Sequence, residues 1–333
     1  MLERVRIGMV GAGAVAARHV RTLLAMEGVE VAGVADPALD RARGLADQAG
    51  AAAYPNHMEL LDGERLDAVY ICVPPFAHGA PELAVIDAGL PLFVEKPVAI
   101  DQETAAGVAA RLAERPLITC TGYHWRWLDI FDRAAELLAD RPARLVQCFW
   151  LDKVPPPPWW LRRDGSGGQV IEQTTHVLDV ARGLAGEVTQ VHAFAARAAT
   201  SPTASAEAAL PAADIHDVSV ASLRFASGAV GTVASTCLLP RLHRAGVQVV
   251  ADGLSLELTE TELVVEVDGE RSAWKAGADA RPRPDADFVA AVRGGPDRIR
   301  VPWPEAYRTH LLACAIVRSA EEGRPLQVTE GSG

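Results

Sequence analysis

Lysine is nearly absent from this chain of 333 residues. Lysine and arginine together number 32, yet only three are lysine: Lys96, Lys153 and Lys275. Arginine therefore serves wherever a positive charge alone is needed. An ammonium differs from a guanidinium because it is compact and can lose its proton when it is desolvated. Lys96 follows the apolar run PLFVE, so its retention points to a chemical role.

Clusters of basic residues and long apolar runs are also missing. Aspartate and glutamate number 43, and the formal net charge is −11. Binding to nucleic acid or to an anionic membrane requires a basic patch, and this acidic chain has no cluster of basic residues. Neither is therefore expected as a partner. No apolar run reaches the roughly 18 residues that a membrane span requires. The composition, with 49% hydrophobic and 23% charged residues, is that of a soluble globular protein.

Cysteine is scarce and scattered. The five cysteines, at positions 72, 120, 148, 237 and 314, form no CxxC pair. We therefore expect reduced, buried thiols, with neither a disulfide framework nor a metal site. The opening stretch RVRIGMVGAGAVAARHV resembles a signal peptide, because arginines are followed there by small apolar residues. Its glycine spacing has a better explanation, given below, and we expect a cytoplasmic protein.

The first 121 residues predict a Rossmann-type doubly wound parallel sheet. Continuous apolar runs alternate there with helical stretches, as in strands that are buried on both faces between crossover helices. The predicted strands are 5–10, 29–35, 67–73, 91–95 and 117–121, and the predicted helices are 14–26, 38–49, 77–89 and 101–115.

Residues 122–333 predict a second, α+β domain with a mainly antiparallel open sheet. Strand-like runs follow one another there with few helices between them. Predicted strands are 143–151, 188–197, 216–226, 229–238 and 246–251, with a hairpin across 254–268; predicted helices are 128–139, 169–185 and 305–322. The last helix is a candidate to pack back on the first domain, and the small polar stretch 198–213 is expected to be a loop.

A glycine turn follows the first predicted strand. Gly11, Gly13 and Ala16 have the G-x-G-x-x-A spacing, and a helix begins at Ala14 and Val15. In a dinucleotide-binding turn the first glycine permits the bend, the second lets backbone approach a pyrophosphate, and the small third residue allows close packing. The free N–H groups of the helix then hold the phosphates. The alternative is a glycine turn that binds no nucleotide.

Asp36 lies twenty residues beyond Ala16, at the end of the second predicted strand. A carboxylate there accepts hydrogen bonds from the ribose hydroxyls of NAD and repels the 2′-phosphate of NADP. Pro37 follows it directly, with no arginine next to it, although Arg41 and Arg43 are near. The pattern favours NAD over NADP.

Lys96 lies at the carboxyl end of the fourth predicted strand, between Glu95 and Pro97. Ligands of open α/β sheets bind at such ends. Glu95 is able to pair with the ammonium or with backbone, and Pro97 prevents further ladder bonding. An exposed lysine in a turn is the alternative.

The stretch VIEQTTHVLDV places Glu172, His176 and Asp179 at i, i+4 and i+7 of a predicted helix. Side chains at this spacing share one face. Two flanking carboxylates orient a histidine ring and stabilise its protonated form, which suits proton transfer. The alternative is a surface helix with ordinary polar residues.

Together these segments resemble the Gfo/Idh/MocA family of sugar and polyol oxidoreductases. The resemblance runs in order over most of the chain and is weakest over 190–300. It rests on the glycine turn, CVPPFAH at 72–78, EKP at 95–97, GYHWRW at 122–127 and the E-x-x-x-H-x-x-D helix.

The resemblance implies a nicotinamide cofactor, a substrate between the two domains, and assembly into homodimers or homotetramers. It implies that Lys96 and His176 are catalytic, together with Glu172. The implied cofactor-binding residues are Gly11, Gly13, Ala14, Val15, Asp36, Pro74, His78, Glu95, Lys96 and Arg126. The implied substrate-binding residues are Lys96, Tyr123, Trp125, Trp160, Glu172, Thr175 and His176. No metal is implied.

Two positions depart from the family pattern. Glu172 stands where the family commonly has aspartate, and Thr174 where it commonly has glycine. The extra methylene moves the carboxylate by about 1.5 Å, enough to change which hydroxyl or base it meets. The role of Glu172 is therefore open, and so is the identity of the substrate.

The predicted reaction is reversible hydride transfer between nicotinamide and a secondary alcohol or ketone of a sugar, cyclitol or similar natural product. His176, with an ordinary histidine pKa of about 6.5, takes the hydroxyl proton, and Lys96 stabilises the alkoxide charge. Trp159 and Trp160 either cover a sugar or nicotinamide ring or latch their loop. The alternative functions are an NAD-dependent glycoside hydrolase and a non-catalytic NAD-binding regulator.

Overall fold

The computed structural model describes residues 4–197 and 213–329, which divide into two compact units. Unit 1 comprises 1–99, 103–124 and 280–307, and unit 2 comprises 100–102, 125–279 and 308–333. The single boundary predicted after residue 121 is therefore incomplete, because the chain returns to unit 1 near its end.

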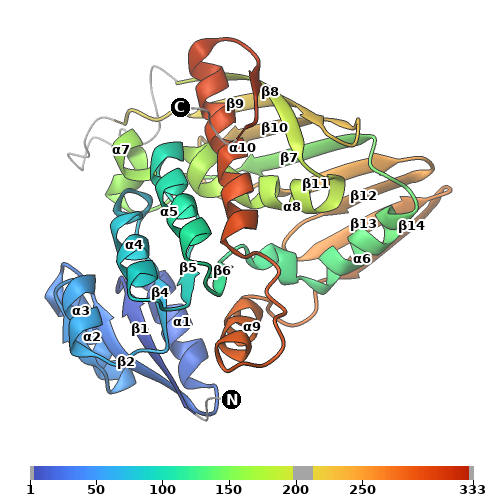
Figure 1. Ribbon diagram of the computed structural model, residues 1–333. Helices are drawn as coiled ribbons and strands as arrows, with labels where there is room; N and C mark the ends of the chain where they lie inside the picture. The colour runs from blue at the N-terminus through green and yellow to red at the C-terminus, as the bar shows by residue number, and fades with distance from the viewer. Residues whose placement is uncertain (1–3, 198–212, 330–333) are drawn as a thin grey trace. The chain divides into compact units, whose positions relative to one another are not determined.

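The sheet of unit 1 has six parallel strands in the order β3-β2-β1-β4-β5-β6. Figure 1 labels β2, β1, β4, β5 and β6 of this sheet. The direction of winding reverses between β1 and β4, which makes the carboxyl ends of these strands the expected ligand crevice. Apart from the short edge strand β3, the strands are largely buried, so their apolar runs are continuous rather than alternating. They are β1 (Val5–Val10), β2 (Val29–Ala35), β3 (Ala52–Tyr54), β4 (Ala68–Ile71), β5 (Leu92–Val94) and β6 (Thr119–Thr121).

Helices alternate with these strands, as crossover connections require. They are α1 (Ala14–Leu24), α2 (Leu39–Ala49), α3 (His57–Gly63), α4 (Ala80–Asp87) and α5 (Gln102–Glu114). A further helix, α9 (Pro282–Val292), packs against α1 and β6. Its apolar anchor Phe288 is fully buried, and Pro282 occupies its first turn, where a missing N–H is tolerated.

The sheet of unit 2 has nine strands in the order β14-β13-β12-β11-β7-β10-β9-β8-β15. All neighbouring pairs are antiparallel except β7 and β10, which run parallel. The strands are β7 (Leu145–Leu151), β8 (Val188–Ala196), β9 (Val218–Phe225), β10 (Val230–Thr236), β11 (Arg244–Ala251), β12 (Leu254–Leu258), β13 (Glu262–Val267), β14 (Glu270–Lys275) and β15 (Leu326–Gln327).

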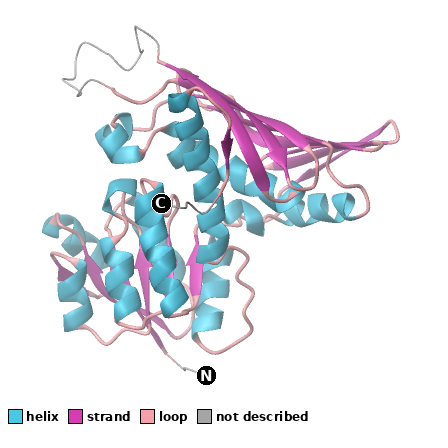
Figure 2. Cartoon of the chain, turned by 45° about the horizontal axis from the view of Figure 1, so that its top comes forward, coloured by secondary structure: helices cyan, strands magenta, loops and turns pink. Residues whose placement is uncertain are grey.

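Helices of unit 2 cover one face of this sheet (Figure 2). α6 (Asp129–Ala139) packs on β12 and β13, and α8 (Thr175–Ala185) packs on β7 and β11. A short helix α7 (Arg163–Ser166) and a π-helical turn (Val170–Thr174) precede α8. The last helix, α10 (Trp303–Glu322), contributes residues to both units. None of the helices in the described ranges is long and apolar enough to cross a bilayer.

Several short elements were not predicted, namely β3, α3, α7, α9, β14 and β15. Because β3 precedes it, the strand that leads to Lys96 is the fifth of the chain, not the fourth. Most of the predicted loop 198–213 lies outside the described residues.

Candidate functional site

The glycine turn after β1 has the backbone that a dinucleotide turn needs. Gly11 has φ +96°, and a Cβ at this position would lie 2.3 Å from the carbonyl oxygen of Cys72. At Gly13 a Cβ would meet no atom within 4 Å, so the space beside it is open. Ala14 and Val15, which begin α1, are exposed. The first glycine is thus required by the fold, whereas the second leaves room for a ligand.

This difference predicts opposite effects for two alanine substitutions. Gly11→Ala should unfold or strongly destabilise unit 1, because the methyl collides with backbone at positive φ. Gly13→Ala should keep the melting temperature, because its methyl meets no protein atom, but lower the affinity for NADH roughly tenfold or more by filling the open space. Thermal denaturation and NADH fluorescence titration measure the two effects. Equal NADH affinity in Gly13→Ala and wild type would show that the phosphates bind elsewhere.

Asp36 follows β2 and faces the glycine turn. Its side chain is 8% exposed, with Oδ2 accepting the N–H of Ala12 at 2.9 Å and Oδ1 accepting that of Ala38 at 2.8 Å. The Arg41 guanidinium also donates to Oδ1 at 2.9 Å, from a side chain that is 65% exposed. The carboxylate is thus fixed beside the turn. The open space at Gly13 and this acceptor fit the pyrophosphate and ribose of a dinucleotide.

Lys96 lies at the carboxyl end of β5 and is half-buried. The Lys96–Pro97 peptide bond is cis. The preceding Glu95 is 6% exposed, and its Oε2 accepts the backbone N–H of Lys96 at 3.1 Å. The hydrogen bond to Glu95 therefore fixes the backbone that carries the ammonium at the sheet edge where ligands of this fold bind.

Pro74 and His78 lie in the loop after β4, around the 3₁₀ turn Pro75–Ala77. His78 is buried, and its Nδ1 lies 2.6 Å from Oε1 of Glu82. Glu82 Oε2 accepts the N–H of Gly79 at 2.6 Å, so the same carboxylate also caps α4. Glu82 thereby orients the His78 ring and fixes this loop beside the ligand crevice.

The segment that carries Glu172 is π-helical, over Val170–Thr174, and α8 begins at Thr175. The prediction of one regular helix was wrong here, and the i, i+4 geometry between Glu172 and His176 does not hold. π-helical turns inside helices are frequent at functional sites. Thr175 is fully buried, as is Thr174, whose hydroxyl has no hydrogen-bond partner among residues 4–197 and 213–329.

Glu172 Oε2 accepts a hydrogen bond from the Trp160 indole at 2.8 Å. Trp160 is 0% exposed and packs with Leu161, Ile215 and Cys237. Of the two predicted roles for this tryptophan, the buried indole agrees with the latch and not with a face that covers a sugar. Trp159, which packs against the same cluster, is only partly buried.

His176 is 8% exposed and lies against aromatic rings. The Trp150 ring is 5.4 Å from its centroid at an interplanar angle of 17°, and the Trp125 ring is 6.3 Å away at 24°. Stacked indoles restrict the imidazole to one plane. Trp125 was among the predicted substrate-binding residues. The contact of Trp150, at the end of β7, with His176 was not predicted, because an aromatic residue in a strand gives no specific signal.

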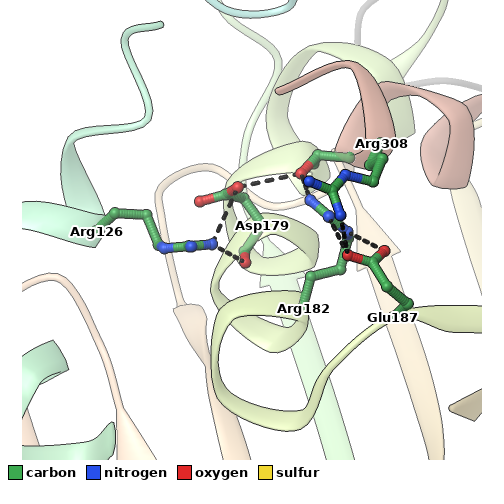
Figure 3. A network of polar contacts seen from close by, with 6 residues as sticks. Arg126, Asp179, Arg182, Glu187 and Arg308 are labelled. Atoms are coloured by element: carbon green, nitrogen blue, oxygen red, sulfur yellow. Dashed lines mark hydrogen bonds and ion pairs between the residues drawn. The ribbon is translucent and has the colours of Figure 1, made fainter. Parts of the chain in front are cut away.

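Asp179 belongs to a polar network that ties α8 to the rest of unit 2 (Figure 3). Its Oδ1 accepts from the Thr309 hydroxyl at 3.1 Å and lies 3.4 Å from Arg126 Nη1, which also donates to its backbone oxygen. Arg182 continues the network, with bonds to Thr309 and to Glu187. These contacts hold Asp179 beside Arg126 and tie α8 to Thr309 of α10.

Glu187 closes this network. Burial alone would raise the pKa of Glu187, but the hydrogen bonds from Arg182 lower it below its usual range, aided by Arg308 at 3.3 Å. The carboxylate is therefore ionised at neutral pH, and its arginine partners keep α8 in place.

The predicted site residues form two groups, which the structure places in different units. Unit 1 contains the glycine turn, Asp36, the loop after β4, Lys96 and Tyr123, which is buried two residues beyond β6. Unit 2 contains Trp125, Arg126, Trp160, Glu172, Thr175 and His176. Each group is internally ordered by the hydrogen bonds and ring contacts described above.

Comparison with known proteins gives matches along most of the chain. A family model described as an oxidoreductase family with an NAD-binding Rossmann fold matches residues 5–123, and one for the GFO/IDH/MocA C-terminal domain matches 142–257. The rhizopine catabolism protein MocA of Rhizobium meliloti is 31% identical over 192 residues, which cover 56% of this chain but only 59% of that protein.

Two further relatives extend the comparison. The myo-inositol 2-dehydrogenase of Thermotoga maritima is 27% identical over 68% of this chain and 67% of its own. The structure of a levoglucosan dehydrogenase in complex with NADH superposes with a TM-score of 0.85 at 19% identity, over 98% of this chain and 99% of that one. At this identity the superposition establishes the fold. Since the two family models together cover more than half of the sequence, the protein belongs to the Gfo/Idh/MocA family of oxidoreductases.

Proposed function

We propose that this protein oxidises a secondary alcohol of a polyhydroxylated small molecule, a sugar or cyclitol, with NAD as acceptor, and catalyses the reverse reduction. The observation that carries the proposal is a lone lysine at the carboxyl end of β5, in a chain that otherwise uses arginine almost exclusively. Relatives named for myo-inositol and levoglucosan support this class of substrate.

In this proposal Lys96 and His176 have different roles in the reaction of the alcohol. The Lys96 ammonium donates a hydrogen bond to the reacting oxygen and stabilises its developing negative charge. His176 takes the hydroxyl proton as general base and returns it in the reductive direction. The indoles of Trp125 and Trp150 restrict the imidazole to one plane. Bound NAD supplies the hydride acceptor, held by the glycine turn and Asp36.

Glu172 has a third role in this proposal. Its Oε2 is bonded to the buried Trp160 indole, which holds the carboxylate near the π-helical turn that leads into His176. We assign it the binding of a substrate hydroxyl, since a carboxylate can accept several hydrogen bonds at once.

The cofactor preference follows from Asp36 and Arg41. Asp36→Ser should lower the preference for NAD over NADP by roughly 100-fold, because it removes a ribose acceptor and releases Arg41 to pair with a 2′-phosphate. Measured kcat/KM for the two cofactors gives the change. In the double variant Asp36→Ser/Arg41→Ala, the increase in kcat/KM with NADP should disappear, because Arg41 is no longer there to pair with the 2′-phosphate. An unchanged ratio in Asp36→Ser would place the ribose away from this carboxylate.

A spectrophotometric screen tests the proposed reaction. NADH formation is followed at 340 nm with sugars, cyclitols and aminoglycosides. Oxidation of at least one polyol by wild type, and its loss in His176→Asn, is the expected outcome. Release of an aglycone from a glycoside without net NADH would instead identify a hydrolase. NAD binding without any turnover across the panel would support a regulator.

A further inference from the structure

His19 is a buried histidine held between two carboxylates of unit 1. Its side chain is 1% exposed, with Nε2 2.9 Å from Oε1 of Glu95 and Nδ1 2.6 Å from Oδ1 of Asp285. Ionised carboxylates only accept hydrogen bonds, so both ring nitrogens must donate, and His19 is an imidazolium. Burial alone would lower the pKa of His19, but its bonds to Asp285 and Glu95 raise it to about 9.

Aromatic side chains enclose this ion cluster. The His19 ring lies 5.0 Å from Phe93 and 5.4 Å from Tyr70, which stack on each other at 4.6 Å. Phe288 of α9 packs edge-on against both. In such surroundings each ionic hydrogen bond is stronger than in water, and an uncompensated charge is costly. The positions of the three ionised groups are therefore tightly coupled.

Glu95 links the cluster to Lys96. Its Oε1 accepts hydrogen bonds from His19 Nε2 at 2.9 Å and from Arg18 Nη2 at 3.1 Å. Its Oε2 accepts the backbone N–H of Lys96. Burial alone would raise the pKa of Glu95, but His19, Arg18 and Lys96 lower it. Gly122 leaves the space for this carboxylate, because a Cβ there would lie 2.5 Å from Oε1.

We propose that His19 and Asp285 are positioning residues for Lys96. They hold the Glu95 carboxylate ionised and in place, and Glu95 in turn fixes the backbone and the charge environment of the ammonium. His19 and Arg18 compensate much of the negative charge that the Lys96 ammonium would otherwise experience. The inference deepens the proposed function, in which Lys96 acts on the alcohol.

The scarcity of lysine makes a direct test possible. Reductive methylation with ¹³C-formaldehyde gives one NMR signal for each of three lysines, and Lys96→Met assigns the signal of Lys96. In His19→Gln the titration midpoint of the Lys96 signal should move up by roughly half a pH unit or more, because a compensating cation is lost from Glu95. Lys153 and Lys275 of unit 2 serve as internal references, and His57→Gln is the matched control.

An unchanged or lowered midpoint in folded His19→Gln overturns the proposal. Gly122→Ala provides a second variant that retains every charged group. Its methyl displaces the Glu95 carboxylate, so the Lys96 signal should move in chemical shift relative to wild type. If the signal stays at its wild-type position in folded Gly122→Ala, Glu95 does not fix Lys96.

A double-mutant cycle separates positioning from general disruption. His19→Gln should lower kcat roughly tenfold or more while the Kd for NADH stays within about threefold, and should cause no further loss when Lys96 is already Met. Equal losses in both backgrounds would mean that His19 does not act through Lys96. If Lys96→Met leaves turnover intact, the proposed function fails, whereas the NMR titration still decides the positioning role.

Discussion

Lys96→Met lowers kcat by an expected 10²- to 10⁴-fold while NADH binding stays close to that of wild type. The methionine keeps the length and apolar character of the side chain but removes the only group assigned to stabilise the alkoxide charge. Losses of this size are typical when an electrostatic donor or a proton-transfer group is removed. Steady-state rates and NADH fluorescence titration measure the two quantities separately.

Lys153→Met is the matched control. Lys153 is exposed in unit 2, where its strand contact is a single bridge to Leu238, so turnover should be unchanged. Full turnover in Lys96→Met would exclude the ammonium from the chemistry. A joint loss of turnover and NADH binding would assign Lys96 to the cofactor instead.

His19→Gln should lower the free energy of unfolding of unit 1 by about 3–5 kcal/mol at pH 6.5, because it leaves the buried carboxylates of Glu95 and Asp285 without their cation. The folded-state pKa of His19 is raised from 6.5 to about 9. Its stabilising effect is therefore complete below pH 6.5, declines as the pH rises and is lost above about pH 9. The linkage amounts to about 3 kcal/mol.

Urea denaturation at pH 6.5 and pH 10 checks this result. The difference in stability between wild type and His19→Gln should shrink by about 3 kcal/mol at the higher pH. Arg18, Glu95, Lys96 and Asp285 are the charged groups around His19, and burial raises the pKa of the nearby Tyr70, Cys72 and Cys120 well above their usual values. These groups titrate in both wild type and His19→Gln, so their contribution cancels in the difference in stability between the two proteins. A constant difference would mean that His19 is neutral in the folded protein.

The sequence predicted the elements of unit 1 best where three independent signals coincide. The strand before Gly11 and the helix after Gly13 were located almost to the residue, because an apolar run, a glycine turn and a helical pattern meet there. β14 (ERSAWK) was missed, since all its residues are exposed and no apolar pattern marks it. α9 begins PRPD, and prolines in that position resemble a loop.

The site was predictable only as far as local motifs extend. Gly11, Asp36 and Lys96 lie within short patterns with a stated chemistry. The two partners of His19, Glu95 and Asp285, are 76 and 266 positions away in the chain, and no spacing rule connects residues at such distances. The π-helical turn at Val170–Thr174 has no sequence signature either, so Glu172 was placed on a regular helix.

The return of residues 280–307 to unit 1 also sets an order for biosynthesis. The last anion of the His19 cluster, Asp285, is translated only after all the strands from β1 to β14. Until then the nascent Rossmann sheet lacks α9 against α1 and β6. The cofactor-binding half, although its strands are translated first, therefore completes its core only after the strands of the second sheet up to β14 have been translated.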